Sequence, residues 1–128
     1  MKILGIGTDI IHNKRINDLI KKKTFLTRTF GKNEIKHSLK TSNKTNFFAK
    51  RFAAKEAFAK SLGTGFRNNL NFKDIEILND NKGKPFYIKS KKIDLIIKKI
   101  FKINNYNLFL SISDEKDYSI AFTILQKK

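Results

Sequence analysis

Residues 47–62 read FFAKRFAAKEAFAKSL, which is the strongest helix signal in the chain. The segment contains neither Gly nor Pro, is dense in Ala and Phe, and is followed by Gly63, a residue suited to the left-handed position after a helix end. At about 100° per residue, Arg51, Lys55 and Glu56 lie on the same side of this helix as several Phe and Ala residues. Charged groups placed among residues that favour burial usually bind something.

Two interpretations of Glu56 are open. Lys60 follows it by one turn, and this Glu-to-Lys order stabilises a solvated helix by about 0.2–0.5 kcal/mol, which would make the two residues a surface ion pair. Nearly every other position of the helix is Ala or Phe, however, so a fully solvated face is hard to find. We therefore favour a functional role for Glu56.

Residues 3–11 read ILGIGTDII and predict a strand. Gly5, Gly7 and Asp9 share one face of it, and we expect the opposite face, which carries Ile6 and Ile10, to be the packed one. Glycine weakens a strand by roughly 0.5–1 kcal/mol relative to alanine, which is tolerated where another group approaches the backbone. The alternative is a glycine-kinked strand that ends in a turn aspartate.

Asp9 and Glu56 together suit a hard divalent cation. Mg²⁺ typically takes one or two protein carboxylates and completes its octahedron with water and substrate phosphate oxygens. Nearby Arg and Lys side chains would then bind the phosphates. The chain contains no GxxxxGK[ST] and no GxGxxG motif, so any phosphate chemistry must depend on a metal and basic side chains.

The rest of the chain predicts a single α+β domain over residues 1–128, with helices packed on antiparallel strands. No repeat or linker interrupts it. Further helices are expected after the candidate N-caps Asn13, Asn33 and Ser90. Two hairpins are expected, one from residues 75–78 and 86–88, the other from residues 108–113 and 118–125.

Composition narrows the function classes. The 128 residues include no Cys, so disulfides, cysteine-ligated zinc and a thiolate nucleophile are excluded. No apolar run approaches the roughly 20 residues of a membrane span, and we expect a cytoplasmic protein with no membrane partner. The 28 Lys+Arg against 11 Asp+Glu give a formal net charge of +17. This favours a polyanionic partner, although the codon bias of an AT-rich genome also explains many lysines.

These residues form a recognisable pattern. The blocks are Gly5-Ile6-Gly7-Thr8-Asp9-Ile10, Arg51-Phe52-Ala53-Ala54-Lys55-Glu56-Ala57-Phe58-Ala59-Lys60, Gly63-Thr64-Gly65, Asp74-Ile75-Glu76-Ile77, Gly83-Lys84-Pro85 and Leu110-Ser111-Ile112-Ser113. In order and spacing they resemble the bacterial holo-acyl-carrier-protein synthases, which are 4′-phosphopantetheinyl transferases. The lysine–glutamate helix block is the most specific, and the likeness spans nearly the whole chain.

The resemblance implies a Mg²⁺-dependent enzyme of fatty acid biosynthesis. It would move the phosphopantetheine arm of coenzyme A onto a serine of apo-acyl carrier protein and release adenosine 3′,5′-bisphosphate. Asp9 and Glu56 match the family's metal ligands, and Lys60 matches a lysine that assists the leaving phosphate or relays a proton. The base for the serine is open between Glu56, a catalytic candidate with Lys60, and a water molecule on the metal.

The resemblance also implies binding surfaces. Coenzyme A would be bound by Arg51, Lys60 and the turn Gly83-Lys84-Pro85. Because acyl carrier proteins are acidic, a basic face would attract them, and its candidates are Arg15, Lys22 and Arg28. The family forms homotrimers with sites at subunit interfaces, so this chain is expected to do the same.

One position departs from the family pattern. After residues 110–113 the family commonly has histidine, whereas this chain has Asp114. An aspartate cannot supply a proton switch near neutral pH without a large pKa shift, and it repels phosphate. Either the position is dispensable or the local contacts are rearranged.

Two other functions compete with the transferase. A basic nucleic-acid-binding module is favoured by net charge, but no RNP1-like string of aromatic and basic residues occurs, so no nucleic acid is expected. The other is a non-catalytic interaction domain of the same fold, against which the intact Asp9, Glu56 and Lys60 argue.

Overall fold

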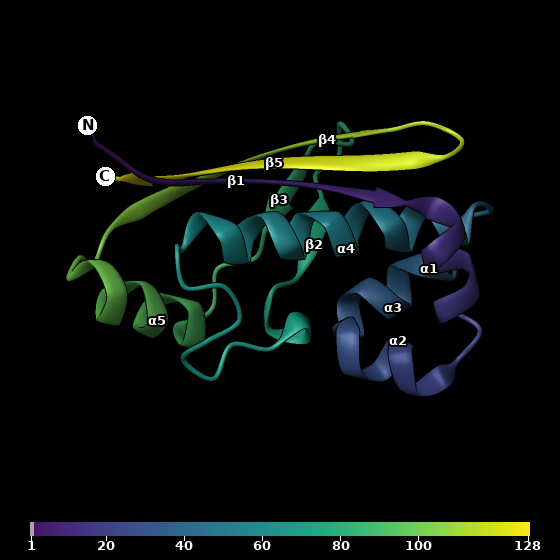
Figure 1. Cartoon of the computed structure of the whole chain (residues 1–128), viewed down its shortest axis with the longest axis horizontal. Coiled ribbons are helices and arrows are strands. Elements are labelled where there is room, and N and C mark those ends of the chain that lie inside the picture. Colours follow the sequence, from purple (N-terminus) through teal and green to yellow (C-terminus); the bar gives the residue numbers. More distant parts are fainter. Residues whose placement is uncertain (1) are drawn as a thin grey trace.

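Helix α4 (Lys44–Ser61) lies along one face of a three-stranded antiparallel sheet, and this pair of layers forms the centre of the fold (Figure 1). The structure is a computed structural model that describes residues 2–128. The sheet has the order β1-β5-β4 and is built from β1 (Lys2–His12), β4 (Tyr106–Asp114) and β5 (Tyr118–Lys127). The predicted α+β class, with helices on antiparallel strands, is confirmed.

The remaining elements lie at the two ends and on one flank of α4. They are α1 (Asn13–Leu19), α2 (Lys23–Thr29), α3 (Lys32–Ser38), the 3-10 turn η1 (Phe72–Asp74), the hairpin strands β2 (Ile77–Asn79) and β3 (Pro85–Tyr87), and α5 (Lys91–Phe101). Helices α1–α3 gather at one end of α4, and α5 lies toward the other (Figure 1). Within residues 2–128, no helix is both long enough and apolar enough to cross a membrane.

The glycines of β1 are explained by the helix beneath them. A Cβ atom on Gly5 would lie 1.7 Å from the carbonyl oxygen of Ser61, and one on Gly7 would lie 1.7 Å from that of Ala57. The strand backbone therefore packs directly on the backbone of α4. The glycine face is the packed face, so the expectation that the Ile6 face is packed was wrong.

The opposite face of the sheet is apolar and uncovered. Its exposed residues are Ile6 at 55%, Ile10 at 60%, Phe109 at 49%, Ile120 at 42% and Phe122 at 40% of their accessible area, and we call them the outer sheet face. Register places Ile6, Ile10 and Phe109 beside outward residues of the central strand β5. An exposed apolar surface of this kind on a folded domain usually marks an interaction site.

Local expectations for the first helices were partly wrong. His12 caps α1, because its Nδ1 accepts from the Lys14 backbone N–H at 3.2 Å, while Asn13 is helical and buried. The Asn13 amide instead donates to the carbonyl of Glu115 at 2.9 Å and so pins the β4–β5 turn. Helix α2 was not predicted, and α3 begins one residue before Asn33.

The contact between β1 and α4 predicts that Gly7→Ala destabilises the fold. The added methyl group would overlap the backbone of α4, which cannot move aside as a flexible side chain can. We therefore expect the free energy of unfolding to fall by about 1–3 kcal/mol or more. Urea unfolding measures it. Thr8→Ala, on the exposed neighbour, should stay within about 0.5 kcal/mol of the wild type. A Gly7→Ala protein as stable as the wild type would contradict the packing argument.

Candidate active site

Asp9, Lys60 and Glu56 meet where β1 runs along α4. The Lys60 Nζ donates to Asp9 Oδ1 at 3.2 Å and to the Thr8 carbonyl at 2.9 Å. The Lys60 side chain remains 54% exposed and that of Asp9 is 17% exposed. Lys60 therefore bridges to the strand, which argues against a simple Glu56–Lys60 surface pair on the helix.

The carboxylates of Asp9 and Glu56 lie close enough to repel each other, and burial disfavours the ionised form of both. Burial raises the pKa of Asp9, against the opposing effects of Lys60 and Arg15. Burial also raises the pKa of Glu56, and the negative charge of Asp9 raises it further, while Lys60 and Arg15 again oppose. Two carboxylates whose ionised forms are disfavoured by burial and mutual repulsion provide a place for additional positive charge.

This donor set fits Mg²⁺. Oxygen ligands are those that a hard cation prefers, and two carboxylates leave positions for water and phosphate oxygens. In the part of the chain that the structure describes, no group of three or more His, Cys, Asp or Glu residues is placed to hold a metal. This arrangement agrees with a site in which the two carboxylates supply part of the coordination shell of the metal and a phosphorylated substrate supplies further oxygens.

A second group of predicted residues surrounds a cavity of about 110 Å³ on the other flank of α4. Its lining includes Lys50, Arg51, Asn79, Gly83, Pro85 and Asp114. Arg51, only 5% exposed, donates through Nη2 to Asn79 Oδ1 at 2.7 Å, and its guanidinium carbon lies 3.7 Å from the centre of the Phe47 ring. Its Nε is buried without a partner among the described residues. Lys84 is exposed in the same turn but does not line the cavity.

Within a single chain, the Asp9–Glu56–Lys60 group and the residues of the Arg51 cavity do not form one site. Arg51 and Glu56 are five positions apart on α4, which is about 140° around the helix axis. Asp9 belongs to β1, whereas Asp114 belongs to β4, and these strands lie at opposite edges of the sheet, two strand spacings or about 10 Å apart. The paired carboxylates and the Arg51 cavity therefore face opposite ways.

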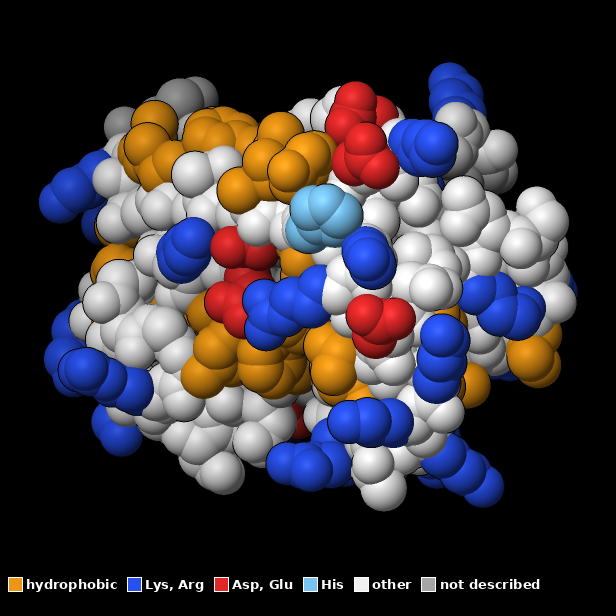
Figure 2. Space-filling view, turned by 45° about the vertical axis from the view of Figure 1, so that its right-hand side comes forward, with side chains coloured by type: hydrophobic (Ala, Val, Ile, Leu, Met, Phe, Trp, Pro, Cys, Tyr) orange, Lys and Arg blue, Asp and Glu red, His pale blue; other side chains and the backbone are white. Residues whose placement is uncertain are grey.

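The three predicted docking residues are all exposed on the α1–α2 end of the molecule. Arg15 lies in α1, Lys22 is the N-cap residue of α2, and Arg28 lies in the last turn of α2. Lys22 and Arg28 also line a cavity of about 660 Å³, whose other walls include Leu19, Phe25, Phe66, Leu70 and Phe72. Figure 2 shows this end of the molecule, where acidic side chains lie among basic ones and beside apolar patches.

Sequence reasoning missed the apolar walls of the larger cavity and, among the polar residues of the smaller one, Lys50 and Asn79. Lys50 and Asn79 line the smaller cavity with Arg51. Lys50 adjoins the helix motif, which was a usable signal, but Asn79 reads as an ordinary turn residue. The aromatic walls come from α2 and from residues 66–72, which lie far apart in the chain, so no local pattern connects them.

Asp114 is held rather than free. The Asn46 side-chain amide donates to Asp114 Oδ2 at 2.8 Å and to the Glu115 carbonyl at 3.0 Å. This carboxylate therefore lines the smaller cavity with an amide partner of its own.

Comparison with known proteins agrees with this fold. The model of the 4′-phosphopantetheinyl transferase superfamily matches residues 5–123. This chain belongs to that superfamily. A holo-[acyl-carrier-protein] synthase of Pelagibacter ubique is 58% identical over 128 residues, covering 100% of both chains.

Solved structures give the same result. The holo-[acyl-carrier-protein] synthase of Neisseria meningitidis is 38% identical with a TM-score of 0.87, over 98% of this chain and 99% of that one. The synthase of Bacillus anthracis, solved in complex with CoA (3′,5′-ADP), is 35% identical with a TM-score of 0.82 over 100% of both chains. The family resemblance seen in the sequence is confirmed.

Proposed function

We propose that this protein, as one domain of 128 residues, transfers 4′-phosphopantetheine from coenzyme A to a serine of apo-acyl carrier protein. The reaction would require Mg²⁺, take place in the cytoplasm and support fatty acid biosynthesis. The observation that carries the proposal is the meeting of Asp9, Glu56 and Lys60 between β1 and α4. The activity named for the Pelagibacter ubique relative and the CoA complex of the Bacillus anthracis relative support it.

Each side chain of the site has a role in this reaction. Asp9 and Glu56 would hold Mg²⁺, which would supply positive charge to offset that of the coenzyme A diphosphate. The serine oxygen bonds to the phosphorus on the pantetheine side while the bond from that phosphorus to the adenosine-side phosphate oxygen breaks. Lys60, exposed and hydrogen-bonded to Asp9, donates to the departing phosphate. Glu56 is the candidate on this chain to accept the serine proton.

The phosphates at the adenosine end of coenzyme A would bind at the Arg51 cavity. Arg51 and Lys50 supply positive charge, and the Gly83–Pro85 turn supplies backbone groups that a phosphate can approach closely. Phosphate groups favour arginine because its planar guanidinium donates two parallel hydrogen bonds. Since this cavity and the paired carboxylates face opposite ways in one chain, one coenzyme A molecule would span two chains.

We therefore propose a homotrimer with its sites at subunit interfaces. In a closed ring, one flank of each subunit meets the opposite flank of the next, so the Asp9 side of one α4 would meet the Arg51 side of its neighbour. The outer sheet face supplies the apolar surface that such an assembly would bury.

The basic end of the molecule is proposed to receive the carrier protein. Arg15, Lys22 and Arg28 are exposed, and Arg15 also faces the paired carboxylates. An acidic carrier helix would be attracted to this surface and its serine brought toward the metal site. Complementary charge of this kind mainly raises association rates.

The metal assignment predicts that Asp9→Ala and Glu56→Ala each reduce transfer by about 100-fold or more, because losing one ligand removes several kcal/mol of charge stabilisation. Mass spectrometry of an apo-carrier protein incubated with coenzyme A and Mg²⁺ reports the added arm. Asp18→Ala, which removes an exposed carboxylate in α1, is the control and should retain activity. Full transfer by both site variants would refute the assignment.

The docking assignment predicts that the double variant Arg15→Glu/Arg28→Glu raises KM for the carrier by about tenfold or more and KM for coenzyme A much less. Reversing two charges replaces attraction by repulsion, and tenfold corresponds to about 1.4 kcal/mol. The matched control is Lys98→Glu/Lys102→Glu at the α5 end. Equal increases in both KM values would place the carrier elsewhere.

The assembly predicts that Ile120→Glu, on the central strand of the outer sheet face, produces monomers. A buried, unpaired carboxylate in an apolar interface is strongly unfavourable. Light scattering coupled to size-exclusion chromatography measures the mass, with Leu95→Glu on exposed α5 as the control. Because the site would be shared between chains, the monomer should also lose transfer. A wild-type protein that is monomeric at micromolar concentration would rule out the trimer.

A further inference from the structure

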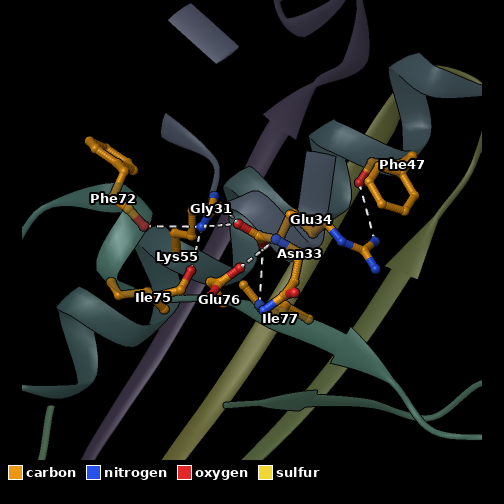
Figure 3. Close-up of polar contacts among 10 residues, drawn as sticks. Gly31, Asn33, Glu34, Phe47, Lys55, Phe72, Ile75, Glu76 and Ile77 are labelled. Atoms are coloured by element: carbon orange, nitrogen blue, oxygen red, sulfur yellow. Dashed lines mark hydrogen bonds and ion pairs between the residues drawn. The ribbon is translucent and has the colours of Figure 1, made fainter. Parts of the chain in front are cut away.

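A fully buried ion pair lies outside both halves of the proposed site. The Lys55 Nζ is 2.7 Å from Glu34 Oε1, and both side chains have 0% exposure. Lys55 comes from α4 and Glu34 from α3, and Figure 3 shows the two side chains pointing toward each other between the helices and residues 72–77. Neither group contacts the paired carboxylates or lines either cavity.

The remaining hydrogen-bonding capacity of the pair is directed at backbone atoms. The Lys55 Nζ also donates to the carbonyl of Phe72 at 3.0 Å and to that of Ile75. Glu34 accepts from the backbone N–H of Gly31 at 3.0 Å and from that of Ile77 at 3.2 Å. Three of these four backbone contacts are to the segment of residues 72–79, which we call the η1–β2 segment.

The η1–β2 segment has little regular structure to hold it. It consists of a three-residue 3-10 turn and a three-residue strand, and that strand pairs only with β3. Three side chains of the segment also accept hydrogen bonds from other elements. Glu76 Oε2 accepts from the Asn33 backbone N–H at 3.2 Å (Figure 3), Asp74 Oδ2 accepts from the Lys92 Nζ at 2.6 Å, and Asn79 Oδ1 accepts from Arg51. The buried pair adds the contacts that reach the backbone of the segment at Phe72, Ile75 and Ile77 from the protein interior, so it acts directly on the position of that backbone.

The two ends of this segment reach the two substrate surfaces. Phe72 forms part of the wall of the cavity beside Lys22 and Arg28. Asn79 accepts from the Arg51 guanidinium at 2.7 Å and lines the smaller cavity. One short segment thus connects the proposed carrier surface to the proposed coenzyme A surface.

We propose that the Glu34–Lys55 pair is a positioning element that sets both substrate-binding surfaces at once by fixing the η1–β2 segment against α3 and α4. The inference rests on the proposed function for the identity of those surfaces. Buried ion pairs add little net stability because desolvation offsets their attraction. Their hydrogen bonds are directional, however, and apolar side chains of the same size would leave the backbone groups of Phe72, Ile75 and Ile77 without partners.

The decisive variant is Lys55→Met, which keeps the unbranched side chain up to the position of Cε and removes the three donor contacts of Nζ. We expect KM for coenzyme A and KM for the carrier each to rise by about tenfold or more. The turnover number should change by less than about threefold, because Asp9, Glu56 and Lys60 are held by the contact of α4 with β1. Hydrogen exchange should show faster exchange for residues 72–79 and unchanged exchange in β1.

Tyr106→Phe is the matched control. Tyr106 is also buried, and its hydroxyl donates to Asp94 at 2.6 Å, far from both surfaces. This variant should lower the melting temperature and leave both KM values unchanged. If Lys55→Met does not fold, Glu34→Gln keeps the side-chain shape and one acceptor oxygen, and its expected changes have the same direction and smaller size.

The outcomes separate the two proposals. If the variants melt earlier but leave both KM values and the exchange of residues 72–79 unchanged, the pair is only structural and the inference is overturned. If the wild-type protein transfers no phosphopantetheine, the proposed function fails. Exchange in residues 72–79 then still decides whether the pair positions the segment.

Discussion

The fold depends on the direct contact between the backbone of β1 and the backbone of α4. Two glycines allow it, because a Cβ at Gly5 or Gly7 would overlap a helix carbonyl oxygen. The short distance between strand and helix is what places Asp9 next to the α4 side chains Glu56 and Lys60. Any larger residue at these positions would push β1 away from α4 and separate the two carboxylates. The glycines therefore serve the site indirectly, by setting the spacing of the elements that carry it.

Helix α4 organises the rest of the molecule because its sides carry different groups. One side holds Glu56 and Lys60 toward β1, another holds Arg51 toward β2 and β4, and Lys55 points into the protein toward Glu34. The charged residues that look misplaced in an Ala- and Phe-rich helix thus have separate environments. The burial of Arg51 and Lys55 is tolerated because each has hydrogen-bond partners from distant segments.

Much of the fold and part of the candidate site could be predicted from the sequence. Helix α4, the amphipathic helix after Ser90 and the two hairpins follow from hydrophobic periodicity and turn residues. Asp9 and Glu56 were recognisable because a carboxylate beside glycines and another within an apolar helix both conflict with simple packing. The packed face of β1 was assigned wrongly, since alternation alone does not say which face a helix covers. Helix α2 was missed because residues 23–29 lack a clear period and a side-chain cap.

The sequence by itself determined the elements, the charge balance and the residue types available for metal and phosphate binding, because these depend on composition and local spacing. Only the tertiary structure decided which residues meet. It paired Lys60 with Asp9 rather than Glu56, gave Lys55 a buried partner 21 positions away, and turned Arg51 away from the carboxylates. Such choices depend on the rotation of α4 and on the close approach of β1. They follow from packing between segments that are distant in the chain, which no local pattern records.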